Sequence, residues 1–495
     1  MDRWYERMRI PAGRLHPFLF AHAEARTRLE ALLWLAGRRA ESLHVVGGAV
    51  RDALSGRDVT DFDFAVRPDA LEIVEPWASA CGGSSVALYE HLPTRRVVFP
   101  DGMTADFVQR RATELVGDLA LRDFTVNAIA VDLSELVRSP DVELIDPLGG
   151  LTDLRARRLV WASDSSLEDD PLRILRAFRL MASHGLRISA NAWDRITLAR
   201  TLVERVSRER VRDELFRLLG TRRAYTALRA MDDAGVLDVV FPELAAMRGV
   251  PQNEYHHLDV WEHTLAAVDV FEREPIPDAL SAVIGAAGDY LTSTVGQFLS
   301  GSAAVKLALL FHDAGKPSTR TEDETGRVRF IGHEAVGAAL FKVAASRLRM
   351  SRRVRGGVEA LVLHHLRTMH LAASESVSPR ALLRFTRDLG PHWVGLLMLS
   401  WADLSASRGP ARSGDHFART STLMSQIAAQ YVTDERAPST QGPLVTGDDV
   451  MGVCGIGPGP DVGSILHRVE RGRLDGELTT RSEALSYIRG LSETG

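Results

Sequence analysis

The sequence of 495 residues contains only two cysteines, Cys81 and Cys454, and neither belongs to a Cys-x-x-Cys pair. Cysteines this few exclude a disulfide-stapled scaffold and a cysteine zinc cluster, and they favour a reducing cytoplasm. The sequence also lacks an apolar stretch near the roughly 20 residues that a membrane helix needs. Its first residues show neither the apolar core nor the cleavage site of a signal peptide. We therefore expect a cytoplasmic protein that does not act at a membrane.

Lysine is scarce, since only Lys306, Lys316 and Lys342 occur and arginine supplies the rest of the positive charge. The formal net charge of −5 does not by itself indicate a nucleic-acid-binding protein. Residues 151–230, however, hold 17 Arg against 10 Asp and Glu. A local basic zone of this kind can neutralise phosphates whatever the net charge of the chain.

The chain is too long for a single hydrophobic core, and its periodicity changes along the sequence. An Arg-rich, amphipathic helical lead-in over residues 1–40 precedes short β-rich runs, and helical spacing begins at residue 151. We expect an α+β protein in which a small mixed-sheet head precedes all-α regions. The expected units are a head with its lead-in at 1–150, a helical neck and body at 151–248, a histidine-rich helical domain at 249–410, and a linker with a small helical tail at 411–495. The expected strands are 43–46, 62–66, 95–99, 103–108 and 127–133.

Two glycines, Gly47 and Gly48, come after the first expected strand and open a short helix. Such a turn lets backbone N–H groups approach a phosphate, and the helix N-terminus favours its negative charge. A tight structural turn explains the same pattern, so the two glycines alone do not establish a phosphate site.

Three carboxylates occupy strand positions further along the chain. Asp61 and Asp63 are two residues apart, so they project from the same face of their strand. Asp106 lies in the apolar strand expected at residues 103–108. Oxygen ligands of this kind suit Mg²⁺ that holds a triphosphate. Three carboxylates are what a two-metal phosphoryl transfer requires, whereas an exposed acidic turn is the alternative for Asp61 and Asp63 alone.

Five consecutive motifs over residues 45–220 resemble the class II tRNA nucleotidyltransferase (CCA-adding enzyme) and bacterial poly(A) polymerase family. They are VVGGAVRD with TDFDFAV, LALRDFTVNAIA (119–130), LIDPLGGLTDLRARRLV (144–160), DDPLRILRAFRLMASHGL (169–186) and SRERVRDELFRLL (207–219). The resemblance implies a polymerase-beta-like nucleotidyltransferase head, and an enzyme that adds C or A to the 3′ end of tRNA from CTP and ATP. The loop at residues 80–96 does not align with any segment of the family. The resemblance therefore does not decide between addition of complete CCA, of CC only and of A only.

The resemblance also implies roles for individual residues. Asp61 and Asp63 would bind Mg²⁺, with Asp106 as the third catalytic carboxylate. The residues implied in nucleotide binding are Gly47, Gly48 and Arg51 at the triphosphate, Arg122, Asp123 and Asn127 at the ribose and the head–neck contact, and Asp170, Arg173 and Arg176 in the motif that selects the base.

Base selection without a nucleic-acid template needs side chains that present a pairing edge. Asp170 and Arg173 are three residues apart, so we expect them on one face of one helix whose first turn contains Pro171. A carboxylate accepts from the exocyclic amine that cytosine and adenine share, and an arginine donates to the neighbouring ring atom. A register shifted to Asp169 is the alternative.

Histidines and aspartates recur in the order His, His-Asp, His, His, Asp between residues 249 and 410. This order resembles HD-domain phosphohydrolases and implies a second divalent-metal site for Mn²⁺, Ni²⁺, Fe²⁺, Zn²⁺ or Mg²⁺. Lys316 comes shortly after the His-Asp pair and is a candidate for binding a substrate phosphate. The expected metal ligands are His263, His312, Asp313, His333, His364 (the first of the pair His364-His365) and Asp403.

The leading hypothesis is therefore addition of C, A or both to tRNA by two-metal phosphoryl transfer, with a phosphohydrolase in the HD domain and no obligate protein partner. A poly(A) polymerase shares every head motif and is the nearest alternative. An HD hydrolase with a non-functional head and a non-catalytic RNA-binding protein are the others, and the three intact carboxylates argue against both.

Overall fold

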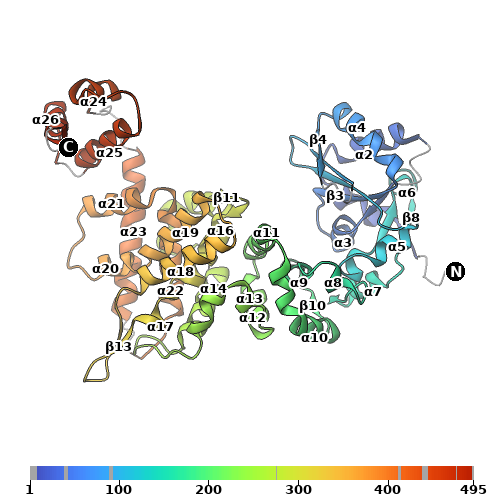
Figure 1. Cartoon of the computed structure of the whole chain (residues 1–495), viewed down its shortest axis with the longest axis horizontal. Helices are drawn as coiled ribbons and strands as arrows, with labels where there is room; N and C mark the ends of the chain where they lie inside the picture. Colours follow the sequence, from blue (N-terminus) through green and yellow to red (C-terminus); the bar gives the residue numbers. More distant parts are fainter. Residues whose placement is uncertain are drawn as a thin grey trace.

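The computed structural model describes residues 8–37, 43–88, 93–274, 276–410, 414–436, 444–474 and 477–492. The molecule is an elongated arch with the N-terminal head at one end and the C-terminal helices at the other (Figure 1). A mixed sheet forms the head, and the remainder is largely helical. The expected α+β architecture is confirmed.

The head is built on an eight-stranded sheet in the order β1-β8-β7-β2-β3-β6-β5-β4. Within this described sheet β3 and β6 run parallel, and the remaining neighbours are antiparallel. The strands are β1 (Met8–Pro11), β2 (His44–Val46), β3 (Asp61–Val66), β4 (Ser84–Leu88), β5 (Thr94–Val98), β6 (Thr104–Gln109), β7 (Ala130–Asp132) and β8 (Asp141–Ile145).

Alternation along β3 separates the core of the head from its polar face. Phe62 and Phe64 are buried, and Phe64 stacks on Phe107 of β6 with ring centroids 4.6 Å apart. Because side chains alternate along a strand, Asp61 and Asp63 project from the opposite face. The helices that complete the head are α1 (His16–Leu19), α2 (Ala25–Ala36), α3 (Gly48–Leu54), α4 (Val74–Ala80), α5 (Leu115–Ala120) and α6 (Leu133–Arg138).

The lead-in is not entirely helical, contrary to the expectation for residues 1–40. β1 pairs antiparallel with β8, with Ile10 opposite Val142, and it closes one edge of the sheet. Both strands are short, and β1 ends at Pro11, so neither carries the long alternation that marks a strand in a sequence. Residues 1–7 lie outside the described part of the chain.

Short helices connect the head to a helical neck and body. α9 carries its apolar residues on one side and its arginines at 173, 176 and 179 on the other, and Gly185 ends it with a left-handed φ of 65°. The helices are α7 (Gly150–Arg155), α8 (Ser166–Asp169), α9 (Arg173–His184), α10 (Ala190–Ala199), α11 (Arg208–Leu219), α12 (Ala224–Asp233) and α13 (Val236–Val240), and β9 (Arg158–Leu159) pairs in parallel with β10 (Arg187–Ile188).

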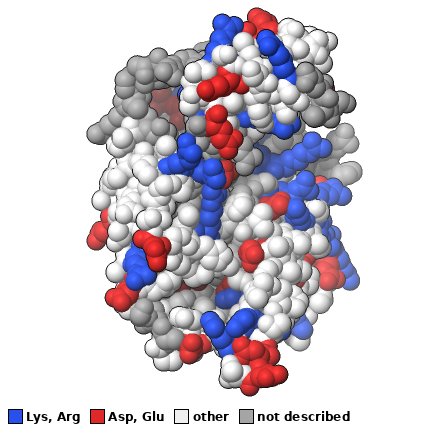
Figure 2. Space-filling view, turned by 90° about the vertical axis from the view of Figure 1, so that its left-hand side faces the viewer, with Lys and Arg blue, Asp and Glu red and all other residues white. Residues whose placement is uncertain are grey.

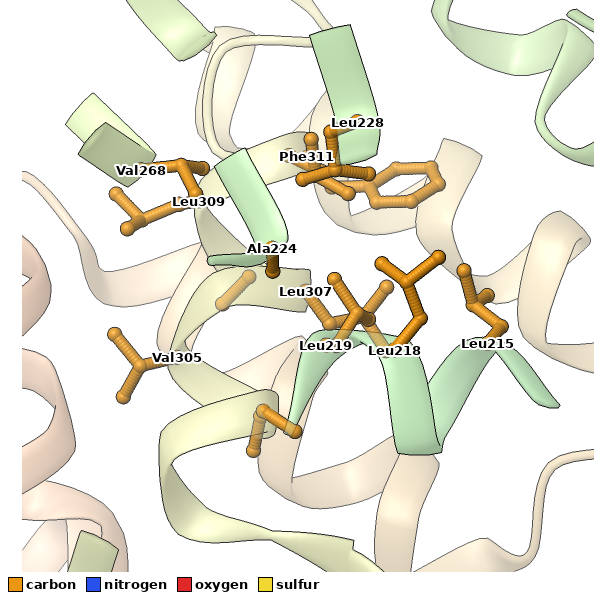
Figure 3. Close-up of a cluster of buried hydrophobic side chains, with 14 of the residues drawn as sticks. Leu215, Leu218, Leu219, Ala224, Leu228, Val268, Val305, Leu307, Leu309 and Phe311 are labelled. Carbon is orange, nitrogen blue, oxygen red and sulfur yellow. The ribbon is translucent and has the colours of Figure 1, made fainter. Parts of the chain in front are cut away.

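One hydrophobic core runs across the boundary that we expected at residues 248 and 249. Leu215, Leu218 and Leu219 of α11 belong to one buried cluster with residues of α12, α14 (Val260–Arg273) and α16 (Gly301–Phe311), part of which Figure 3 shows. Ala224 and Leu228 contribute from α12 to the same cluster. The body and the histidine-rich region therefore share a core, whereas the head keeps a core of its own.

The histidine-rich region is a helical array centred on α16, which is buried along almost its whole length. Residues 272–303 supply a helix and a hairpin that pack into the core. The elements are α14 (Val260–Arg273), α15 (Ile284–Thr292), β11 (Thr294–Gly296), β12 (Leu299–Ser300), α16 (Gly301–Phe311), α17 (Lys316–Thr319), β13 (Arg320–Glu322), β14 (Val328–Phe330), α18 (His333–Arg347), α19 (Arg352–His364), α20 (Arg367–Ala372), α21 (Pro379–Leu389) and α22 (Trp393–Ala406).

Between the expected linker segments we predicted a short helix, and the structure has there α23 (Gly414–Arg436), a longer helix of 23 residues that packs on α20, α21 and α22. The expected linker sequences are RGPARSG (408–414) and ERAPSTQG (435–442), and their residues 411–413 and 437–442 lie outside the described part of the chain. α24 (Gly447–Cys454), α25 (Pro460–Leu474) and α26 (Arg481–Ser492) form the tail around a small core of their own. Across the described ranges, every helix is too short or too polar to cross a membrane.

Candidate active site and candidate metal centre

The three predicted carboxylates meet on the polar face of the head sheet. Asp63 on β3 lies directly opposite Asp106 on β6, and Asp61 lies opposite Thr104 in the same register. Thr104 donates a hydrogen bond of 2.5 Å from its hydroxyl to Asp61. Burial raises the pKa of Asp63, and the nearby charge of Asp106 adds to this although Arg122 opposes it. A divalent cation fits here because it would relieve the repulsion between adjacent carboxylates.

The glycine turn brings the backbone against these carboxylates. Gly47 has a φ of 70°, and a Cβ there would lie 2.9 Å from Nη1 of Arg122 and 3.2 Å from Oδ2 of Asp63. Only glycine meets both constraints. Arg122 also has a buried Nε without a hydrogen-bond partner among the described residues. The turn and Arg122 thus bring positive charge and N–H groups to the carboxylates, as a triphosphate site requires.

Arg96 is a residue of this site that the sequence did not single out. It lies opposite Asp106 on the antiparallel neighbour β5, and it donates hydrogen bonds of 2.7 and 2.5 Å to the two carboxylate oxygens. Nothing in the local sequence RRVVF distinguishes Arg96 from Arg95, because only the register of β5 on β6 decides which arginine faces the carboxylate.

A buried polar network joins the head to the neck. Arg51 donates a 2.5 Å hydrogen bond to Asn127, and the Asn127 amide donates one of 2.9 Å to Asp123. Arg176 of α9 donates a hydrogen bond of 2.9 Å to the other oxygen of Asp123. Burial alone would raise the pKa of Asp123, but the charge of Arg176 and the hydrogen bonds outweigh it and hold that pKa well below its ordinary value. The predicted residues Arg51, Asp123, Asn127 and Arg176 therefore lie in one connected group.

Asp170 and Arg173 are not on one helix, contrary to the expectation. Asp170 has an extended backbone at the end of α8, and α9 begins at Arg173. Pro171 and Leu172 form the turn between them, and Asp170 accepts a 3.2 Å hydrogen bond from the Leu172 amide. The turn displaces the two side chains from the helical spacing that the sequence suggested.

The partners of Asp170 and Arg173 also differ. Arg210 of α11 donates a hydrogen bond of 2.7 Å to Asp170. Arg173 donates through Nη1 to the carbonyl of Arg122 at 3.0 Å and through Nη2 to that of Leu121 at 2.8 Å. Arg173 thus fixes the start of α9 against the head motif that contains Arg122.

The second cluster is organised around Asp313, which directly follows His312 at the end of α16. Its Oδ2 lies 3.2 Å from Nε2 of His312 and 3.7 Å from Nε2 of His263. Its Oδ1 lies 3.4 Å from Nε2 of His333 and 4.0 Å from Nε2 of His365. One carboxylate therefore faces two separate histidine pairs, an arrangement that can bridge two metal ions.

Backbone carbonyls orient three of these histidines. The Nδ1 atoms of His312, His333 and His365 lie 2.7, 2.6 and 2.8 Å from carbonyl oxygens three residues earlier in the chain. An Nδ1–H that donates to a carbonyl leaves the lone pair of Nε2 directed into the cluster, as metal ligation requires. The Nε2 of His312 is buried and has no hydrogen-bond partner in the described chain.

The electrostatics of the cluster fit a cation. Burial would lower the pKa of His312, but Asp313 and Asp403 raise it to about 10, so these carboxylates favour a positive charge beside Nε2, which a metal ion would supply in place of a proton. Burial and the neighbouring histidines lower the pKa of His365 to about 3, so its imidazole is neutral and available as a ligand. The buried carboxylate of Asp313 and the half-buried one of Asp403, set among imidazoles, are a donor set that suits a divalent transition metal.

The expected ligand His364 is corrected to its neighbour His365. His365 is buried in the cluster, whereas His364 is more exposed and does not belong to the candidate metal groups of the described residues. His256, which the sequence did not single out, forms a further candidate group with His263 and Asp403. Its only sequence signal is the pair His256-His257, which carries no information on which histidine faces inward.

Lys316 lies beside the cluster but has protein partners. Its Nζ donates hydrogen bonds of 2.7 Å to Asp313 and to Gln252. A cavity of about 440 Å³ opens next to these groups, and Asp313, His333, His365 and Lys316 are among the residues that line it. The cluster is thus buried on one side and accessible to a small molecule on the other.

Comparison with known proteins supports the head and the neck independently. Residues 43–160 match the family described as the Poly A polymerase head domain, and residues 185–248 match the probable RNA and SrmB-binding site of polymerase A. An A-adding tRNA nucleotidyltransferase of Deinococcus radiodurans is 34% identical over 457 residues, which cover 91% of this chain and 95% of that protein. A CC-adding tRNA nucleotidyltransferase of Thermus thermophilus is 32% identical over 449 residues, 90% of this chain and 92% of that protein.

Solved structures share the fold at lower identity. A CCA-adding enzyme solved with CTP aligns with a TM-score of 0.58 at 19% identity, covering 99% of this chain and 100% of that one. The CCA-adding enzyme of Thermotoga maritima complexed with tRNA aligns with a TM-score of 0.57 at 18% identity, with coverage of 99% and 100%. With its carboxylate triad, its glycine turn and its HD-like His/Asp cluster, this chain belongs to the class II tRNA nucleotidyltransferase and poly(A) polymerase family.

Proposed function

We propose that this nucleotidyltransferase adds C or A to the 3′ end of tRNA by two-metal phosphoryl transfer. The observation that carries the proposal is the placement of Asp63 opposite Asp106, with Asp61 on the same strand and the Gly47 turn against them. Mg²⁺ bound by these carboxylates would hold the triphosphate and activate the 3′ hydroxyl for in-line attack.

The residues around the carboxylates would bind and orient the nucleotide. The N–H groups of the Gly47-Gly48 turn and the guanidinium of Arg122 would bind the triphosphate. The network of Arg51, Asn127 and Asp123 would keep the head and the neck in register while the nucleotide is bound.

We propose that Asp170 reads the exocyclic amine that cytosine and adenine share. Its carboxylate is partly exposed and is held by Arg210. Arg173 would donate from its Nε, for which no partner is found in the described chain, while Nη1 and Nη2 stay on the head carbonyls. Uracil and guanine present a carbonyl oxygen where this site requires an amine, so they would be rejected.

The RNA partner is supported by the local distribution of charge. Figure 2 faces the C-terminal end of the arch, where Lys and Arg side chains gather toward the middle of the face and Asp and Glu are scattered. A second basic zone, residues 151–230, holds an excess of arginine and overlaps over residues 185–230 with the region that matches a probable RNA-binding family. Nucleic-acid affinity depends on such local charge more than on the net charge of −5.

The experiment that tests the proposal compares four substrates with labelled CTP or ATP. The substrates are tRNA transcripts that end before CC, after CC or after CCA, and an RNA of equal length without a tRNA body. Incorporation of A after CC alone identifies an A-adding enzyme, and incorporation of C alone on the shortest transcript identifies a CC-adding enzyme. Full CCA identifies a complete enzyme. Extension of the RNA without a tRNA body by many A residues would instead establish a poly(A) polymerase.

We further propose that the Asp313 cluster hydrolyses phosphate esters independently of the head. A specific observation favours this second function, since the two oxygens of Asp313 face two histidine pairs beside an open cavity. Asp313, Asp403 and the surrounding histidines would hold a divalent metal, which would lower the pKa of water for attack on a phosphate ester. Simple phosphate esters and 2′,3′-cyclic nucleotides, tried with Mn²⁺, Ni²⁺ and Mg²⁺, are the first substrates to test.

A further inference from the structure

The β11–β12 hairpin presents an exposed aromatic side chain on the body. Phe298 occupies the tip of this hairpin and is 84% exposed to solvent. Figure 1 shows β11 beside α11 on the concave side of the arch, between the head and the tail. A single exposed apolar side chain is common on protein surfaces, so the exposure of Phe298 gains meaning only from the backbone and the charges around it.

The turn that carries Phe298 has an unfavourable backbone. Gln297 has a φ of 47° and Phe298 a φ of 66°, so two consecutive residues with side chains adopt the left-handed region. Two-residue hairpin turns of this type normally use Asn-Gly, because other residues are strained there. Strained backbone of this kind persists where the surrounding structure holds it and is concentrated at functional sites.

Hydrogen bonds from the Gln297 side chain hold the turn in place. Its Oε1 accepts from the amide of Ser351 at 2.6 Å, and its Nε2 donates to the carbonyl of Arg349 at 3.4 Å. Arg212 of α11 donates to the same Arg349 carbonyl at 2.7 Å. The hairpin is thereby attached to α11, which lies within the region that matches a probable RNA-binding family.

Positive charge lies beside the hairpin. Arg352 and Arg353 are both exposed at the start of α19, directly after the Ser351 amide that Gln297 binds. A Cβ at Gly296 of β11 would lie 3.7 Å from the Cβ of Arg353, so this arginine adjoins the turn. Neither arginine forms an ion pair with a described residue. An exposed aromatic ring beside uncompensated arginines is the combination with which proteins bind unpaired nucleotides, the ring by stacking and the arginines at the phosphates.

We propose that Phe298 stacks on an unpaired base of the RNA substrate and that Arg352 and Arg353 contact its phosphates. This inference rests on the proposal that tRNA is the substrate. An RNA surface is favoured over a protein surface because the adjacent charge is positive and because the hairpin is continuous with the RNA-binding region. Phe298 is thus a substrate-binding residue of the body, remote from the catalytic carboxylates of the head.

The test measures dissociation constants of the full-length protein for a tRNA transcript without CCA, over a series of salt concentrations. Phe298→Gly should weaken binding by about five- to 150-fold, because stacking of one base contributes on the order of 1–3 kcal/mol. Phe298→Trp keeps an aromatic face and should bind close to wild type. Arg352→Gln should lower the slope of log affinity against log salt by about one, whereas Phe298→Gly should leave the slope unchanged because it removes no charge.

Phe298→Gly also separates a binding role from a structural one. Glycine relieves the left-handed backbone, so the variant should unfold at the same or a higher temperature while it loses tRNA affinity. Trp34→Ala, at a position 79% exposed on α2 of the head, is the matched control and should bind tRNA as wild type does. An unchanged tRNA dissociation constant for Phe298→Gly would overturn the inference. If the wild-type protein still extends tRNA, this result leaves the proposed function unaffected. A wild-type protein that neither binds nor extends tRNA would instead contradict the proposed function.

Discussion

Asp63 and Asp106 are direct neighbours across the only parallel strand pair of the described head sheet. In parallel register their carboxylates project from the same face, although the two residues are 43 positions apart in the sequence. This pairing, and the groups that contact it, determine how variants of the head should behave.

Asp63→Asn should reduce nucleotide addition by about a thousandfold or more, because a lost metal ligand removes several kcal/mol of transition-state stabilisation. The change keeps the shape of the side chain and removes a buried charge, so urea unfolding should show no loss of stability. Asp58→Ala, at an exposed position before β3, is the matched control and should retain activity. Near-normal incorporation of labelled CTP or ATP by Asp63→Asn would refute the assignment of the catalytic carboxylates.

Arg96→Gln should lower the Mg²⁺ concentration needed for half-maximal nucleotide addition. Arg96 donates to both carboxylate oxygens of Asp106, so a metal ion must displace it or share the carboxylate with it. Arg95→Gln, on the same strand, pairs with Glu75 and should leave the Mg²⁺ requirement unchanged. A higher Mg²⁺ requirement for Arg96→Gln would show that Arg96 assists metal binding instead of competing with it.

Asp123→Asn should destabilise the head–neck contact by about 3 kcal/mol, because it leaves Arg176 without its buried partner. The folded-state pKa of Asp123 is depressed, so its contribution is complete at pH values above the unfolded carboxyl pKa of about 4 and is lost as the pH falls below it. Urea unfolding at pH 7 and near pH 3 should therefore separate wild type from variant at pH 7 and bring them closer in acid. Asp164→Asn, on an exposed ion pair with Arg195, should change stability by less than about 1 kcal/mol at either pH.

Asp170→Ala should impair the use of CTP and ATP together and admit UTP or GTP. The variant removes the acceptor that the exocyclic amines would meet, so discrimination of the base should fall while the metal site stays intact. Incorporation of each of the four nucleotides, measured as kcat/KM, gives the readout. Asp169→Ala is the matched control, since Asp169 accepts a hydrogen bond from Ser165 on the exposed side of the turn. Lost discrimination in Asp169→Ala and not in Asp170→Ala would transfer the selecting role to Asp169.

The neighbours His364 and His365 should behave oppositely. His365→Ala should lower the metal content of the purified protein and any hydrolysis of phosphate esters, because its imidazole faces Asp313. His364→Ala should retain both, since His364 lies outside the cluster. Both variants should add nucleotides at the wild-type rate. Wild-type protein without a bound transition metal and without hydrolysis in Mn²⁺, Ni²⁺ or Mg²⁺ would make the cluster a structural feature.

Several elements could not be predicted because their local signals are weak. The edge strands β1 and β4, and β8 next to β1, have four or five residues each, and pairing with neighbouring strands stabilises them more than their own alternation does. The shared core of α11, α12 and α16 was likewise hidden, since apolar periodicity shows that a helix has a buried face and not which helix covers it. The hydrophobic core therefore extends across the domain boundary that we expected between residues 248 and 249.

Local sequence patterns were enough to identify the central strands of the head, the order of the motifs, and the residue types that we propose for the chemistry. Alternation assigned Phe62 and Phe64 to one face of β3 and Asp61 and Asp63 to the other, because that periodicity is local. Tertiary packing decided which residues meet. Arg96 and not Arg95 binds Asp106, and His365 and not His364 faces Asp313. Packing also left Asp170 in an extended conformation before α9. Two adjacent residues of the same type differ only in the direction in which their side chains point. Strand register and helix packing between segments far apart in the chain set that direction.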